Sequence, residues 1–348
     1  MGRVGYPDAM RTSRFARSVL AVLLLVALIM VPDSPSTAQD APATRTLTFA
    51  TLAPPGSVLM RALDAWNREI RRRSNRTLQF RIYSGGVQGD EPEVIRKIRS
   101  GRLDAGGVTS TGLAQIHRPA LVFQLPGTFR TYEQVRAARA ALGPEIEAGI
   151  IQQGFRMLGW TEIGQARLFS NRELHTPQDL APCRFWVRSG DPIMPTLFQV
   201  VRTNTVALSV PEVLGGLQTG RIDTFIAPPA VAVALQWSSR VTYVTDTPSA
   251  ILVGGTIISE RTFQSLTPEQ QTILTESSAQ VHALGQRNAV RAETQALEAL
   301  TTHGVTITRL SPSDIAAWRT VGREVRTRVA SQIASPELIA RAAAFGEQ

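Results

Sequence analysis

The sequence predicts an α/β fold made of two similar lobes, and three observations support that prediction. A strand, a helix and a second strand follow one another between Thr46 and Tyr83. One helix–Gly–Arg–strand unit occurs twice, in residues 92–108 and 211–227. After Thr267 the chain is mostly helical. With 348 residues, the chain is long enough for two domains of ordinary size.

The first strand–helix–strand unit is clear from its hydrophobic pattern. Residues 46–51 and 78–83 alternate apolar and polar side chains, as half-buried strands do. Between them, residues 58–73 carry apolar side chains at helical spacing, after a loop of Pro54-Pro55-Gly56-Ser57. A strand–helix–strand order of this kind predicts a parallel pair of strands.

The repeated unit suggests that the two lobes are alike. Residues 92–104 read PEVIRKIRSGRLD and residues 211–223 read PEVLGGLQTGRID, with six of thirteen positions identical. Each segment fits a short helix closed by a glycine, Gly101 or Gly220, and then enters an apolar strand. Chance is the alternative, because helix–glycine–strand junctions are common in α/β folds. Two facing lobes would place a ligand cleft at the loops that follow the strands.

Hydroxyl residues followed by proline mark several helix starts, at Thr176, Thr267, Ser311 and Ser335. The hydroxyl can accept a free backbone N–H of the first turn, and proline loses no hydrogen bond there. These patterns predict where helices begin and carry no information about a ligand. A further strand is expected within residues 305–310.

Charge and cysteine content exclude several classes of function. Lys and Arg number 37 against 28 Asp and Glu, yet no basic run interleaves with aromatic residues, so nucleic-acid binding is not expected. The four histidines lack zinc-ligand spacing, and Cys183 is the only cysteine. No dinucleotide fingerprint, phosphate loop or nucleophile elbow is found. We therefore expect a binding protein without metal or cofactor rather than an enzyme.

The N-terminus is typical of an export signal. Three arginines precede an unbroken apolar run of 13 residues at 19–31, which is short for a membrane span. Small residues then predict cleavage after Ala38. An uncleaved membrane anchor is the alternative. We expect residues 1–38 to be a signal peptide and the mature protein to be periplasmic.

Trp186 is the strongest candidate for a pocket residue. It lies in a short predicted strand, Phe185 to Val187, and Arg188 and Asp191 follow in the next loop. An aromatic wall beside a strand-end loop with polar groups is typical of ligand pockets. The alternative for this tryptophan, as for Trp160, is a place in the core.

Six short motifs then follow one another along the chain. They are GGVQGDE at 85–91, RLD at 102–104, LPGTFR at 125–130, TPQDL at 176–180, VPEV at 210–213 and LQTGRID at 217–223. In this order and spacing they resemble the substrate-binding proteins of the tripartite ATP-independent periplasmic (TRAP) transporters. The resemblance covers residues from about 47 to about 328.

The resemblance implies a periplasmic-binding-protein-like fold, in which two α/β lobes joined by crossing strands and long helices close on a ligand through a hinge. Applied to this chain, it gives lobe I as residues 45–164 plus about 250–265, and lobe II as residues 165–249. Residues 266–348 would form a mainly helical segment packed across both lobes. It also implies integral membrane permease subunits as partners. We expect the protein itself to be a monomer.

Most relatives of this kind bind organic acids through an arginine in the strand after the threonine–proline helix. Here Trp186 occupies that position, and Ala227 stands where an asparagine is usual. Arg188 lies two residues on and would share a face with Trp186. Arg167 matches another arginine of the family. This pattern suggests a distinct branch whose ligand is an organic acid or a more hydrophobic molecule.

The predicted function is that of an extracytoplasmic solute-binding protein that delivers a small organic molecule to a TRAP-type transporter. In this site the tryptophans would pack on the ligand, the arginines would hold any anion, and Thr109 and Gln88 would contribute from lobe I. The predicted ligand-binding residues are Trp186, Trp160, Arg167, Arg188, Asp191, Thr109, Gln88 and Phe225.

Two alternatives remain at this stage. One is an exported enzyme on the same fold, with Asp90, Glu91 and Asp191 as its acids and bases. The other is a sensory binding protein that docks on a membrane receptor. We expect the repeated charged residues, Arg102 with Asp104 and Arg221 with Asp223, to be framework rather than ligand contacts.

Overall fold

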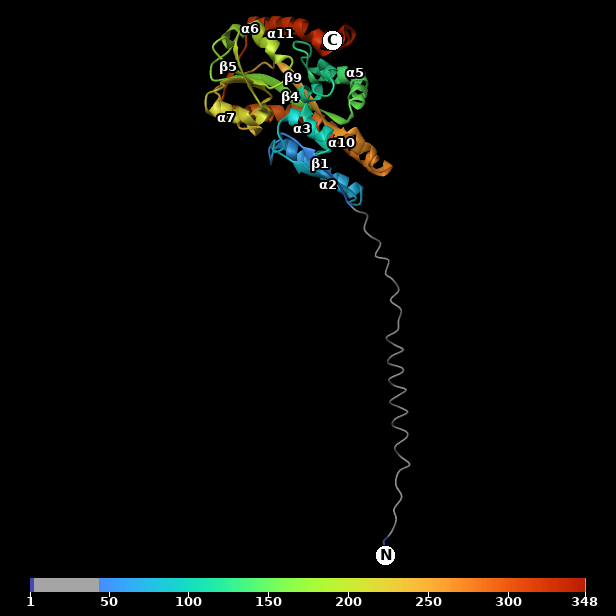
Figure 1. Cartoon of the computed structure of the whole chain (residues 1–348). Coiled ribbons are helices and arrows are strands. Elements are labelled where there is room, and N and C mark those ends of the chain that lie inside the picture. Colours follow the sequence, from blue (N-terminus) through green and yellow to red (C-terminus); the bar gives the residue numbers. More distant parts are fainter. Residues whose placement is uncertain (3–43, 348) are drawn as a thin grey trace. The chain divides into compact units, whose positions relative to one another are not determined.

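A mixed sheet of ten strands organises the part of the chain that the computed structural model describes, residues 1–2 and 44–347 (Figure 1). Eight strands follow in the order β2-β1-β3-β9-β4-β7-β5-β6, and β8 pairs with both β4 and β10. The predicted signal peptide and its cleavage site lie outside the described residues. The strands are β1 (Arg45–Ala50), β2 (Leu78–Tyr83), β3 (Ala105–Thr109), β4 (Phe155–Ser170), β5 (Arg184–Arg188), β6 (Asn204–Leu208), β7 (Thr224–Ala227), β8 (Tyr243–Thr245), β9 (Ala250–Ser259) and β10 (Thr306–Thr308).

Strand β4 belongs to two halves of this sheet. Its residues 155–166 pair antiparallel with β9, which also pairs with β3. Its last residues, from Arg167 to Ser170, pair with β7 and β8 instead. We call β2, β1, β3, β9 and the adjoining part of β4 the first half, and β7, β5, β6, β8, β10 and the end of β4 the second half. Figure 1 shows β4 and β9 in the middle of the body, between β5 and α5 (Tyr132–Gln152).

The predicted strand–helix–strand unit at the start of the first half is confirmed. Helix α2 (Val58–Arg73) begins after Ser57, whose side chain accepts the Met60 N–H, and strands β1 and β2 are parallel. The helix buries a face that includes Trp66, whose ring meets that of Phe49 edge-on. The unit is therefore held by packing of this helix on its two strands.

The repeated segments form the same local structure in each half. Helix α3 (Glu91–Arg99) leads to β3, and the short helices η3 (Val210–Glu212) and α7 (Val213–Gln218) lead to β7. Gly101 and Gly220 follow the helices with φ of +76° and +67°, a conformation that favours glycine. The predicted helix–glycine–strand junction is thus present twice.

The repeated aspartates make equivalent contacts. Asp104 Oδ2 accepts the backbone N–H and the hydroxyl of Thr48, both at 2.8 Å. Asp223 Oδ1 accepts the backbone N–H of Arg184 at 2.8 Å, and its other oxygen pairs with the guanidinium of the same residue at 3.0 Å. Each aspartate therefore fastens its strand to the neighbouring strand of its own half, as expected for framework residues.

The C-terminal helices begin where the sequence predicts. Helices α10 (Pro268–Thr302) and α11 (Pro312–Ile333) start with capping boxes at Thr267 and Ser311, and α12 (Pro336–Glu347) follows. At Thr176 the expected helix is only one turn of 3₁₀ helix, η2 (Pro177–Leu180). The remaining helices are α4 (Ser110–Ala114), η1 (Arg118–Gln124), α6 (Met194–Val201), α8 (Pro229–Ala234), η4 (Trp237–Arg240) and α9 (Glu260–Gln264).

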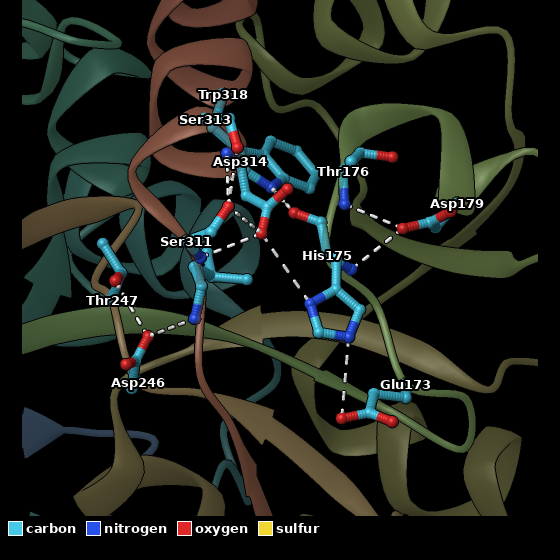
Figure 2. A network of polar contacts seen from close by, with 11 residues as sticks. Glu173, His175, Thr176, Asp179, Asp246, Thr247, Ser311, Ser313, Asp314 and Trp318 are labelled. Atoms are coloured by element: carbon cyan, nitrogen blue, oxygen red, sulfur yellow. Dashed lines mark hydrogen bonds and ion pairs between the residues drawn. The ribbon is translucent and has the colours of Figure 1, made fainter.

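A polar network fixes the start of α11 to the second half (Figure 2). Trp318 of α11 donates its indole N–H to the carbonyl of His175 at 2.9 Å. The ring of His175 lies 3.8 Å from the Asp314 carboxylate. Asp246, beyond β8, accepts the Leu310 N–H at 3.2 Å. These contacts join segments that lie more than 60 residues apart in the sequence.

Apolar clusters pack on both halves of the sheet. In the first half they are centred on Trp66 and on Phe123, and in the second half on Phe225 and on Phe185. Among the described residues, none of the helices has both the length and the apolar character that a bilayer crossing requires.

Candidate functional site

Polar side chains from the two halves meet where parallel strands end. Arg188, the last residue of β5, donates from Nη1 to Glu91 Oε2 and to Thr109 Oγ1, both at 2.8 Å. Glu91 is the first residue of α3, and Thr109 is the last residue of β3. One arginine of the second half is therefore held by two residues of the first half, at the edge where α/β proteins bind ligands.

The carboxylate of Glu91 is fixed by its surroundings. It accepts the backbone N–H and the hydroxyl of Thr109, at 3.1 Å and 2.7 Å, and its side chain is only 3% exposed. A Cβ added to Gly112 would lie 2.5 Å from Glu91 Oε2, so a side chain there would displace this oxygen. The preceding residue, Asp90, caps α3 by accepting the Glu91 N–H at 2.7 Å.

Three carboxylates act on Arg188. Burial favours the neutral guanidine, but the negative charges of Glu91, Asp90 and Asp191 outweigh burial, so the pKa of Arg188 rises. The Arg188 side chain is 12% exposed. The arginine is therefore a firmly charged group with a partner supplied by the chain itself.

Two more hydrogen bonds cross between the halves near this pair. Asp90 Oδ2 accepts the Val210 N–H at 3.0 Å, and Gln115 donates to the Gly190 carbonyl at 3.5 Å. In the repeated segments, Val210 is the counterpart of Glu91. The starts of the two related helices thus lie next to each other.

Trp186 lies on the same strand as Arg188 and is half-buried. Its indole N–H donates to the Leu208 carbonyl at 3.1 Å, and its ring meets Trp237 edge-on with centroids 5.1 Å apart. Ala227, the other position with an unusual residue, is buried at the end of β7. Trp186, on the strand that ends at Arg188, thus packs on a buried tryptophan of the second half and has its indole N–H already bonded.

Asp191 and Gln88 are engaged with neighbouring groups. Asp191 Oδ1 accepts the backbone N–H groups of Ile193 and Met194 at 2.8 and 3.0 Å. Burial raises the pKa of Asp191, although these donors and Arg188 oppose the rise. Gln88 accepts from Lys97 Nζ with both its backbone and its side-chain oxygens.

Three of the predicted ligand-binding residues are buried and in contact with other side chains. Phe225 is fully buried and stacks on Phe169 with centroids 4.9 Å apart, so we leave it out of the site. Trp160 is 7% exposed and donates to Glu147 at 2.6 Å. Arg167 is also 7% exposed and pairs with Glu293 at 3.1 Å.

The sequence pattern did not indicate the partners of either arginine. Glu91 could be recognised only as a helix-start residue or as a candidate acid, because Arg188 lies 97 residues further along the chain. Glu293 lies inside α10, 126 residues after Arg167, and it also accepts the Tyr132 hydroxyl at 3.0 Å. Burial and the carboxylate of Glu293 contribute to raising the pKa of Tyr132.

Comparison with known proteins finds solute-binding proteins of low sequence identity to this chain. A solute-binding protein of Chromohalobacter salexigens is 24% identical over 172 residues, which are 49% of this chain and 51% of that protein. The 2,3-diketo-L-gulonate-binding periplasmic protein YiaO of Escherichia coli is 24% identical over 67% of this chain and 71% of its own length. The chain thus spans about half of the first relative and more of the second.

Solved structures share the fold. A TRAP periplasmic solute-binding protein from Shewanella oneidensis, with bound succinate, matches with a TM-score of 0.82 and 17% identity over 87% of this chain and all of that one. DctP7 of Bordetella pertussis, an extracytoplasmic solute receptor binding pyroglutamic acid, matches with a TM-score of 0.79 and 18% identity over 88% of this chain and all of that one. The α/β fold predicted from the sequence is thereby confirmed.

The family of bacterial extracellular solute-binding proteins, family 7 (DctP), matches residues 49–332, which is most of the chain. The motifs that resemble TRAP substrate-binding proteins all lie inside this range. This protein belongs to the bacterial extracellular solute-binding proteins of family 7.

Proposed function

We propose that this protein is the extracytoplasmic receptor of a TRAP-type secondary transporter, and that it delivers a small organic molecule to integral membrane permease subunits. Family membership and the names of the matching structures support this proposal. The observation that carries it is the meeting of Arg188 with Glu91 and Thr109 between the two halves. A solute held between the halves would stabilise their closed arrangement.

We propose that four of the predicted residues contact the ligand and that a fifth positions a loop beside them. Trp186 and Arg188 would act from the second half, and Thr109 and Gln88 from the first, while Asp191 would position the loop after β5. This proposal divides the chain as the sequence suggests, into lobe I (45–164 and about 250–265), lobe II (165–249) and a helical segment (266–348).

Trp186 in the usual arginine position would place this chain in a separate branch of the family. The ring contact with Trp237 and the burial of Ala227 support a second lobe that is more apolar than is usual for organic-acid receptors. The strand still offers a guanidinium two residues on, that of Arg188, which is paired with Glu91.

We also propose that the protein is exported to the periplasm by cleavage after Ala38 and acts there as a monomer. Intact-mass measurement of protein recovered from a bacterial periplasm should give a chain that begins at Gln39. Size-exclusion chromatography with light scattering should give one chain per particle. A dimer, or a chain that retains residues 1–38, would contradict these proposals.

Tryptophan fluorescence tests the site directly. The exported protein is titrated with a library of metabolites of every charge class, and hits are confirmed by calorimetry. We expect Trp186→Phe to reduce the fluorescence response, because Trp186 lies beside Arg188. Trp66→Phe is the matched control, since Trp66 lies on the buried face of α2 with its N–H bonded to Ser277. A response that survives in the Trp186 variant and disappears in the Trp66 variant would place the ligand elsewhere.

We propose that the bound solute leaves unchanged. The acids that the enzyme alternative would use are engaged: Glu91 with Arg188 and Thr109, and Asp90 and Asp191 with backbone N–H groups. Mass spectrometry after prolonged incubation with any confirmed ligand should recover the ligand intact. A new product that accumulates with time would favour the enzyme.

A further inference from the structure

The Arg188 guanidinium lies among more negative than positive charge. Three carboxylates, those of Glu91, Asp90 and Asp191, act on this single guanidinium. Lys97 of α3 is engaged separately, by Gln88 at 2.9 Å and by Glu93 at 4.0 Å. A site with this balance repels an additional anion rather than attracting one.

Glu91 pairs with Arg188 in the way that the carboxylate of an anionic ligand would. Its carboxylate is 2.8 Å from Arg188 Nη1 and also accepts two hydrogen bonds from Thr109, so its oxygens are already bonded. Gly112 packs directly against this carboxylate, since a Cβ there would lie 2.5 Å from Oε2. Turning Glu91 away would deprive the Arg188 guanidinium of its ion-pair partner and leave two partly buried Thr109 donors without their acceptor, which is unfavourable.

We propose that Glu91 determines the charge of the ligand, so that this receptor selects uncharged organic molecules and rejects organic acids. The inference rests on the proposed function and specifies its substrate class. Arg188 would still offer its other N–H groups to hydroxyl or carbonyl oxygens, and the Trp186 ring would cover an apolar face of the solute. A solute carboxylate in the same place would lie next to Glu91, Asp90 and Asp191.

The experiment measures acid binding before and after the Glu91 charge is removed. Isothermal calorimetry is carried out on the exported protein with succinate, D-galacturonate and pyroglutamate, for wild type, Glu91→Gln and the double variant Glu91→Gln with Arg188→Met. The expected result is at least tenfold tighter binding of one or more of these acids to Glu91→Gln than to wild type. That gain should be absent from the double variant. Glu93→Gln is the matched control, because Glu93 is on the same helix but pairs with exposed Arg96.

A second variant covers the case in which Glu91→Gln does not fold. Glu91→Ala leaves a space beside Arg188, so acetate should bind there and raise the melting temperature of Glu91→Ala above its value in chloride of equal ionic strength. Wild type and Glu93→Gln should show no such difference between acetate and chloride. Stabilisation of this variant by acetate would show that the Glu91 carboxylate occupies the position that a ligand carboxylate would take.

Two results would overturn the inference. One is wild-type protein that binds any of these acids tightly and loses that binding in Arg188→Met. The other is no gain of acid binding in either Glu91 variant. In the first case the proposed function stands and only the ligand class is wrong. In the second case, if wild type also responds to no solute in the full metabolite library, the proposed function fails as well.

Discussion

The two repeated segments share their framework and differ where a ligand would bind. Asp104 and Asp223 hold neighbouring strands through the same kind of hydrogen bond, and both follow a glycine with positive φ. The residue that starts the first helix is Glu91, whereas its counterpart is Val210. The repeated residues thus determine how each half is built. At the start of the helix, in contrast, only the first copy carries a carboxylate.

The same contrast appears within the strands that follow. Gly106 and Phe225 are counterparts, and both are buried. A Cβ on Gly106 would lie 3.0 Å from Val94 and 3.1 Å from the Ala50 carbonyl, so a side chain there would press on both neighbours. Phe225, in contrast, fills its half with a ring that contacts Phe169 and Trp237. Equivalent backbone therefore supports two differently packed cores.

The largest effect is expected from Phe225→Ala. Removing a fully buried ring should lower the free energy of unfolding by about 3–5 kcal/mol, because the cavity cannot collapse completely. Chemical denaturation measures this loss. Any ligand affinity measured on the fraction that remains folded should be close to that of wild type, since Phe225 is enclosed in the core. A variant that is fully stable yet unable to bind would restore Phe225 to the ligand site.

Substitution of the two aspartates tests whether the frameworks are equivalent. Asp104→Ala and Asp223→Ala should each cost about 2–3 kcal/mol, because each removes several hydrogen bonds to a charged acceptor. Urea unfolding of the two variants should agree within about 1 kcal/mol. A large inequality would show that one copy carries more of the stability than the other.

A smaller effect is expected at Asp191, and it should depend on pH. The pKa of this carboxyl is raised in the folded protein above its unfolded value of about 3.9. Its contribution to stability is therefore fully present below pH 3.9 and is lost as the pH rises through the folded pKa. Asp191→Asn keeps an oxygen for the N–H groups of Ile193 and Met194 and should not show this loss. Unfolding curves of both proteins from pH 4 to pH 8 should converge at the acidic end, with the variant relatively more stable at pH 8.

The smallest effects are expected at the repeated arginines. Arg102 and Arg221 are both exposed, so Arg102→Ala and Arg221→Ala should each change the free energy of unfolding by less than about 0.5 kcal/mol. Thermal melting is sufficient to compare them. A loss of more than about 1 kcal/mol in the free energy of unfolding for either variant would show that the repeated arginine also stabilises the fold.

Much of the fold could be predicted from local patterns. The β1-α2-β2 unit, the glycine-closed helices and the starts of α10 and α11 each depend on residues close together in the sequence. The short turn at η2 was overestimated, because a capping box marks where a helix begins and does not fix its length. The identity of the fold followed from the order of several such patterns.

The site was harder to predict because its contacts are long-range. Arg188 could be proposed from its strand, but its pairing with Glu91 depends on how two distant helix and strand ends are brought together. The complete burial of Phe225 was hard to predict for a related reason. The run Thr224–Ala227 is mostly apolar and lacks the alternation that would show which face of a strand is buried.

Lys97, whose ammonium group donates to Gln88, makes the protein suitable for selective chemical labelling. Lys97 is the only lysine in the chain, so an amine-reactive dye has one side-chain target, apart from the terminal amine. That target lies on α3, the helix that begins with Glu91. The single cysteine, Cys183, is fully buried and will compete little with a second dye attached to an introduced thiol. Two fluorophores can therefore be attached independently, one of them next to the proposed ligand contacts, without first removing native reactive groups.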